Sequence, residues 1–136
     1  MEDKFGLKVA ADRGITLRSI GDKILLENEL IRMWEVRLEP GQTLGFHIHY
    51  HPYVVVSLSG GENEIETISG KKISTDEPAG SFVFINEMRE VHQLTNKSNV
   101  TYLSRLIEMK SVTWSTEGPA AYFRYIDASV AGDRSE

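Results

Sequence analysis

Three of the four histidines in this chain are placed where a divalent metal ion would need them. His47 and His49 are two residues apart. Alternate side chains of a β-strand share a face, so we expect the two imidazoles to lie side by side. Neutral imidazole nitrogens bind several divalent metals well. The pair therefore predicts a metal site, although a surface or hydrogen-bonded pair is the alternative. The third ligand must come from a distant strand, and we expect it to be His92.

Two further residues beside this pair are the candidate catalytic residues. His51 shares the parity of His47 and His49, but Pro52 follows it and is expected to bend the chain. We interpret His51 as a residue next to the ligands or as a base. Tyr53 is either a phenolate ligand or a neutral side chain lining the cavity. A phenol with the ordinary pKa of about 10 needs strong help to ionise at neutral pH, which favours the neutral form.

The pattern of apolar residues predicts short strands rather than helices. No window of a dozen residues holds apolar side chains at helical spacing, whereas alternating and β-branched runs recur between Gly, Pro, Asn and Asp turns. Many short strands with regular turns indicate an antiparallel sandwich or barrel. The predicted strands are Ile15–Ile20, Lys23–Leu26, Leu30–Leu38, Gly45–His49, Tyr53–Leu58, Glu62–Thr67, Lys71–Ser74, Ser81–Ile85, Glu90–Thr95 and Thr101–Met109.

Composition narrows the classes of protein that this chain can belong to. A chain of 136 residues with 40% apolar and 26% charged residues is expected to form one globular domain. The net charge is −5 and the basic residues are scattered, which argues against nucleic-acid binding. No apolar run approaches the roughly 20 residues that a bilayer needs. There is no cysteine, so thiolate chemistry and disulfides are excluded. The charged start, without a signal-peptide core, makes the cytoplasm the expected location.

Two motifs resemble those of the cupin superfamily. In the first, Gly41 precedes His47 and His49 by the family spacing, and six residues separate Tyr53 from Gly60. The second motif consists of Pro78-Ala-Gly80 followed by His92 and then Asn96. The match departs from the family at Tyr53, where the family motif has its glutamate ligand, and none of residues 42–61 is Asp or Glu. The resemblance therefore implies a neutral three-histidine shell.

The resemblance also implies a fold and an architecture. The expected fold is all-β, a double-stranded β-helix or jelly-roll barrel over about residues 30–110, with the metal at its wider end. The chain would be one domain over 1–136 with a flexible tail at 130–136. Within the superfamily, the runs Trp34–Gly41 and His47–Val56 resemble the small β-alanine-degradation-like cupins, a label that describes gene context and names no reaction.

The function implied is metal-dependent chemistry on a small organic acid. A Fe, Ni, Mn or Zn ion would polarise an anionic substrate, in a reaction of the dioxygenase or of the isomerase/lyase type. Two alternatives stay open: a non-catalytic binder or sensor of a small ligand, and a cupin that has lost its metal. By analogy with dimeric small cupins, we expect a homodimer. The aromatic stretch Tyr122–Ile126 is expected to pack on the barrel or on a second subunit.

The remaining charged and large apolar residues of the strands are expected to have structural roles. Four charged residues inside apolar strands are expected on solvated outer faces, with the cavity as the alternative for some of them: Glu35, Arg37, Arg105 and Glu108. Six large apolar residues are expected to fill the core or line its wall: Met33, Trp34, Phe46, Phe82, Phe84 and Leu94.

Overall fold

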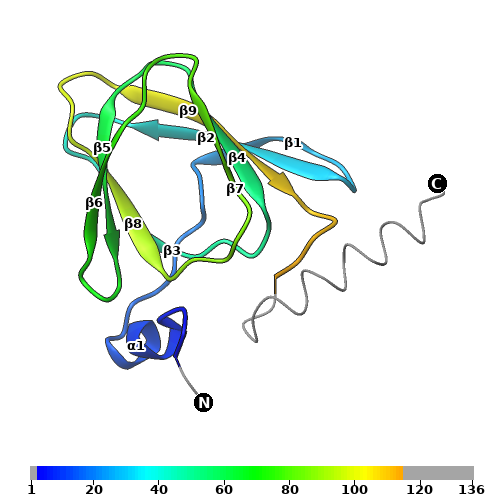
Figure 1. Cartoon of the computed structure of the whole chain (residues 1–136), viewed down its shortest axis with the longest axis vertical. Coiled ribbons are helices and arrows are strands. Elements are labelled where there is room, and N and C mark those ends of the chain that lie inside the picture. Colours follow the sequence, from blue (N-terminus) through cyan, green and yellow to red (C-terminus); the bar gives the residue numbers. More distant parts are fainter. Residues whose placement is uncertain (1–2, 115–136) are drawn as a thin grey trace.

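The computed structural model describes residues 3–114 as two antiparallel sheets with a short helix at one end (Figure 1). The five-stranded sheet has the order β1 (Lys23–Glu27), β2 (Ile31–Leu38), β9 (Tyr102–Met109), β4 (Tyr53–Ser57), β7 (Phe82–Ile85). The four-stranded sheet has the order β3 (Thr43–His47), β8 (His92–Asn96), β5 (Glu62–Thr67), β6 (Lys72–Asp76). The predicted all-β class is confirmed.

The sheets are built from strands that are distant in sequence. β9 lies between β2 and β4, and β8 lies between β3 and β5. Burial alternates along β9, where Tyr102, Ser104, Leu106 and Glu108 face inward. Such alternation is expected of a strand with one face on the core. The two inner faces form the main core between the sheets.

The predicted strand at Ile15–Ile20 is wrong, and a short helix precedes it instead. Residues 15–20 form neither strand nor helix, and one backbone hydrogen bond, from the N–H of Arg18 to the carbonyl of Phe46, joins this segment to β3. A single bond does not make a ladder. The helix α1 (Leu7–Asp12) spans fewer than two turns, too few for a helical period to be visible in the sequence.

The N-terminal segment packs against the segments that carry the histidines. Phe5 and Ala10 pack in a second apolar cluster with Ile48, Ile68 and Val91. Ile48 lies between His47 and His49 in the chain, and Val91 immediately precedes His92. The chain approaches this cluster at Gly6, whose φ is +77° and where a Cβ would overlap Cγ2 of Ile68. Glycine is required there.

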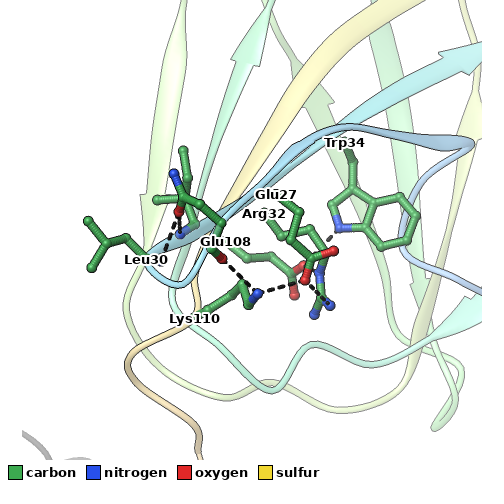
Figure 2. Close-up of polar contacts among 8 residues, drawn as sticks. Glu27, Leu30, Arg32, Trp34, Glu108 and Lys110 are labelled. Atoms are coloured by element: carbon green, nitrogen blue, oxygen red, sulfur yellow. Dashed lines mark hydrogen bonds and ion pairs between the residues drawn. The ribbon is translucent and has the colours of Figure 1, made fainter.

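The outward assignment of Glu108 is wrong. Its side chain faces inward and is 3% exposed. Its Oε1 accepts hydrogen bonds from Nε of Arg32 at 2.7 Å and from Nε1 of Trp34 at 2.8 Å (Figure 2). Beside it, Lys110 and Arg32 both contact the Glu27 carboxylate and so tie the end of β9 to the β1–β2 hairpin. A buried carboxylate is tolerated here because charged and polar donors satisfy it.

The assignment to the core or its wall is wrong for Phe84, which lies on the edge strand β7 and is 53% exposed. Phe82 on the same strand is 76% exposed, but it is one of the residues that line a cavity inside the barrel. Trp34 and Leu94 do pack against the main core, and Phe46 packs against the second cluster. Glu35 and Arg105 form an ion pair at 3.6 Å on the outer side of the sheet. Polar and apolar residues therefore share that outer face.

Some expectations fall on residues that the structure does not describe. The aromatic stretch Tyr122–Ile126 and the tail at 130–136 lie outside residues 3–114. Within the described residues, no helix has the length and apolar character needed to cross a membrane.

Candidate metal centre

Pairing of two strands brings the first two histidines together. His47 is the last residue of β3, His92 is the first residue of β8, and the two are cross-strand partners. His49 lies two residues past the end of β3, so it is held by the following loop rather than by the strand expected at Gly45–His49. Its ring nevertheless joins the other two. The three side chains that the sequence predicted to converge do so.

The three imidazoles form one tight cluster. One nitrogen of each ring lies within 4.8 Å of the corresponding nitrogens of the other two. The ring centroids are separated by 4.5 Å for His47 and His92, 5.1 Å for His47 and His49, and 5.3 Å for His49 and His92. A small inward movement would bring these nitrogens to the distances of ligands that share one ion, about 2.0–2.1 Å from it.

Backbone carbonyls fix the tautomer of two of the rings. Nδ1 of His47 lies 2.7 Å from the carbonyl oxygen of Gly45, and Nδ1 of His92 lies 2.8 Å from that of Glu90. A carbonyl oxygen can only accept, so each Nδ1 carries the proton and each Nε2 keeps its lone pair. Such outer hydrogen bonds orient metal-binding histidines.

All three imidazoles are held in the neutral form that binds metals. Burial, with a smaller contribution from His92, lowers the pKa of His47 to about 4. Burial and then His47 lower the pKa of His49 well below its ordinary value, and burial lowers that of His92. Neutral imidazole is the ligand form of histidine.

The donor set fits a divalent ion. Nδ1 of His49 is buried and has no hydrogen-bond partner within residues 3–114, which costs free energy when nothing satisfies it. Three neutral nitrogens without a carboxylate suit Zn, Fe, Ni or Mn, and they do not identify which. His47, His49 and His92 would hold the ion, and other positions would be left to water or ligand.

Comparison with solved structures identifies the fold. A cupin domain from Bordetella pertussis is 26% identical and aligns with 70% of this chain and 99% of its own, with a TM-score of 0.60. The chain has the cupin fold. A protein with a double-stranded β-helix domain from Klebsiella pneumoniae (23% identity, 69% of this chain and 83% of its own, TM-score 0.52) shares it. A cupin 2 conserved barrel domain protein from Salinispora arenicola does so as well (19% identity, 85% and 92%, TM-score 0.50).

The predicted double-stranded β-helix is thereby confirmed, and membership of the cupin superfamily is supported. No family model matches the chain, and no curated protein matches its sequence. The similarity therefore supports the fold assignment only. The function has to be inferred from the residues of the site.

Tyr53 lies against the histidine cluster. Its ring stacks on His49 with centroids 4.0 Å apart and an interplanar angle of 19°. Burial raises its pKa to about 12, so the hydroxyl keeps its proton at neutral pH. In this state Tyr53 can donate a hydrogen bond into the cavity, in agreement with the interpretation as a neutral lining residue.

His51 lies outside the cluster. Its Nδ1 is 2.6 Å from the carbonyl oxygen of Val112, so the ring donates to the segment that follows β9. Neither the metal-competent group nor the cavity lining includes it. The chain bends at His51, directly before Pro52. The role of His51 as a base stays a prediction.

A cavity of about 360 Å³ extends from the histidines into the barrel. Its apolar walls include Val55, Ile65 and Leu94. Arg89, in the loop before β8, is the one lysine or arginine among the described residues that line it. Its half-exposed guanidinium makes only a loose 3.9 Å pair with Glu87, and its charge acts on both Tyr53 and His92.

A polar network borders the cavity away from these residues. Glu77 accepts hydrogen bonds from the hydroxyl of Tyr102 at 2.6 Å, from Asn63 at 2.8 Å and from Thr75 at 2.8 Å. Sequence analysis identified neither Arg89 nor this network, because loop residues carry no periodic signal and the network joins distant strands. Arg89 stands three residues before His92 in the sequence, and this proximity to a predicted ligand is the signal that was available.

Proposed function

We propose that this cupin is a metal-dependent enzyme acting on a small organic acid, with one divalent ion held by His47, His49 and His92. The observation that carries the proposal is the cluster of three neutral imidazole nitrogens, within 4.8 Å of one another, at the side of an apolar cavity. A cavity of about 360 Å³ suits a small ligand. The reaction classes proposed are a dioxygenase and an isomerase or lyase. We also propose that, among cupins, the chain is related to the small β-alanine-degradation-like proteins.

A bound divalent ion would supply Lewis-acid polarisation of the oxygens of a carboxylate, keto or enolate group. The protein supplies binding and orientation. Arg89 would bind the carboxylate of the substrate, because its planar fork matches a carboxylate with two parallel hydrogen bonds and its own ion pair is weak. Its place in the cavity lining favours an anionic ligand.

The side chains around the cluster would control protons and water. Tyr53 keeps its hydroxyl proton and would donate it as a hydrogen bond to an oxygen of the substrate. The walls formed by Val55, Ile65 and Leu94 limit water near the reacting group, and exclusion of water strengthens the electrostatic contacts of Arg89.

Metal analysis tests the ligand set. Protein purified without chelators should contain close to one equivalent of a divalent metal per chain, and His49→Ala should lose at least ten-fold in metal content. His51→Ala is the matched control, a histidine of the same loop outside the cluster, and it should keep the metal. If wild type binds none of Fe, Ni, Mn and Zn on reconstitution, the proposal fails and the interpretation as a cupin without its metal takes its place.

Turnover tests the enzyme class separately. The metal-loaded protein would be assayed for oxygen uptake and for conversion of 2-oxo and 2-hydroxy carboxylates of two to six carbons. Product that forms with wild type and not with His49→Ala would support catalysis.

A non-catalytic ligand-binding cupin is the second candidate. It is favoured by the protonated state of Tyr53 and by the position of His51 off the cavity lining, which leave few groups to accept a proton beside the cluster. Tight binding of a carboxylate to the loaded protein, with no product over many hours, would select this function.

A further inference from the structure

A second polar group forms the end of the cavity that lies away from the histidines. Glu77, between β6 and β7, and Tyr102, the first residue of β9, both line the cavity. Thr67 on β5 lies opposite His92 on the neighbouring β8 (Figure 1), and the strand from Thr67 to Asn63 runs about 13 Å. Nδ2 of Asn63 donates to Glu77, so the carboxylate of Glu77 lies near that far end. A ligand that contacts both ends must be an extended molecule.

The carboxylate of Glu77 has a fixed orientation and a free acceptor site. Its Oε2 accepts hydrogen bonds from Asn63 and Thr75, each at 2.8 Å, whereas its Oε1 accepts one, from the hydroxyl of Tyr102 at 2.6 Å. Burial, and then the bond to Glu77, raises the pKa of Tyr102, so this hydroxyl keeps its proton and donates it. Each carboxylate oxygen can accept two hydrogen bonds, so Oε1 can accept one more.

No cation among the described residues neutralises this carboxylate. None of the ion pairs within residues 3–114 includes Glu77. Arg89, the one lysine or arginine in the described lining, acts on Tyr53 and His92 at the other end. Asp76 adds a second negative charge to the lining beside Glu77. An unpaired charge beside apolar walls costs free energy, which a cationic ligand at this end would offset.

A second acceptor in the same network also has no donor. Asn63 is 1% exposed, and its Oδ1 has no hydrogen-bond partner within residues 3–114. The amide cannot be reversed, because Oδ1 would then meet the carboxylate of Glu77 in place of Nδ2. Buried acceptors are normally satisfied. Two acceptors with unused capacity therefore favour a ligand that brings several N–H donors to this end.

Apolar side chains separate the two ends of the cavity. On β5, Ile65 lies midway between Thr67 and Asn63. Its cross-strand partner Leu94 and Val55, in the middle of β4, belong to the same walls. Such walls favour a chain of methylene groups, because its burial removes apolar surface from water.

We propose that Glu77 binds a cationic amine at the far end of the substrate, so that the substrate is an acid whose amine and carboxylate lie at opposite ends of an apolar chain. The carboxylate end rests on the function proposed above, in which Arg89 binds that group beside the ion. The amine end rests on Glu77 and its network alone. An ammonium group offers three N–H donors, and its hydrogen bonds to a carboxylate are about twice as strong as neutral ones.

Calorimetry on the metal-free protein tests the amine end by itself. Wild type should bind pentylamine roughly ten-fold more tightly than pentan-1-ol, a neutral molecule of the same length. Glu77→Gln should abolish this preference. Glu62→Gln is the matched control, because it removes one charge from an exposed position on β5 outside the cavity lining, and it should keep the preference. Equal affinity of wild type for the two molecules, or an unchanged preference in Glu77→Gln, would overturn the proposal.

The metal-loaded protein tests the two ends together. Wild type should bind 6-aminohexanoate roughly ten-fold more tightly than hexanoate, and Glu77→Gln should bind the two equally. Equal affinity of wild type for the two acids would overturn the amine assignment and leave the proposed function intact. Binding of pentylamine but of neither acid would support Glu77 and contradict the proposed function. Thermal melting reports whether Glu77→Gln is folded; if it is not, the paired molecules compared on wild type decide the proposal.

Discussion

Acidification should lower the free energy of unfolding of the metal-free protein, because its buried histidine cluster resists protonation. Burial and the neighbouring His92 hold the pKa of His47 at about 4, against an ordinary value of 6.5. Because the folded-state pKa is the lower one, the unfolded chain binds more protons between these two values. The stability is therefore complete above about pH 6.5 and is lost as the pH falls toward about 4.

The size of the effect follows from that difference in pKa. At pH 5 the imidazole of His47 is almost fully protonated in the unfolded chain and about one tenth protonated in the folded one. The resulting loss between pH 7.5 and pH 5 is about 2 kcal/mol from this residue alone. His49 and His92 change stability in the same direction, because burial lowers their pKa values too.

Urea unfolding of the metal-free protein measures this loss. Wild type and His47→Gln would be compared at pH 7.5 and pH 5 at one protein concentration, so that the contributions of other groups cancel. The stability of wild type should fall by about 2 kcal/mol more than that of the variant. Leu44→Ala removes a neutral lining residue and should cost the same free energy at both pH values. Equal pH dependence of wild type and His47→Gln would refute the argument.

Three further predictions concern residues around the barrel. Glu108→Ala should lower the free energy of unfolding by about 1–3 kcal/mol, because the indole N–H of Trp34 loses its acceptor and Arg32, which is 27% exposed, keeps only its pair with Glu27; Glu64→Ala, which removes a 4.0 Å surface pair, should cost less than about 1 kcal/mol in the same urea titration. Gly6→Ala should destabilise by about 2–4 kcal/mol because it adds an overlap to an unfavourable φ of +77°. Gly41→Ala, with φ +81° and open space, should cost about 1 kcal/mol, and equal melting temperatures for the two variants would contradict the overlap. Arg89→Gln should keep the metal and weaken binding of a 2-oxo carboxylate at least ten-fold by calorimetry, and unchanged affinity would rule out a role for this guanidinium.

The local pattern of the sequence was enough to predict most of the strands. A β-branched run for β4, flanking glycine turns for β5 and a long apolar-rich run for β9 locate these strands to within a residue or two. The segment at Ile15–Ile20 was predicted from a pattern of this kind and forms no ladder. A segment forms a strand only where a neighbouring strand has unpaired backbone N–H and C=O groups along its edge. The sequence pattern of the segment itself does not show whether such a neighbour is present.

The types of the site residues and the convergence of the three histidines were predicted from the sequence, but the strand pairing that brings them together was not. His47 and His49 are close because they are close in the chain. His92 joins them because β3 pairs with β8 in a register that sets His47 opposite His92, and register belongs to the whole sheet. The loop after β3, not strand parity, orients His49 and turns His51 away.

The sequence alone determined the all-β class, the turns and the supply of neutral nitrogen ligands, because these depend on residue type and on neighbours in the chain. The tertiary structure decided which face of each strand is inside. It buried Glu108 against Arg32, brought Arg89 to the cavity, and left Phe84 on the outer face. Each of these outcomes depends on pairing between distant strands, and the free energy of that pairing is a property of the assembled barrel rather than of any one segment.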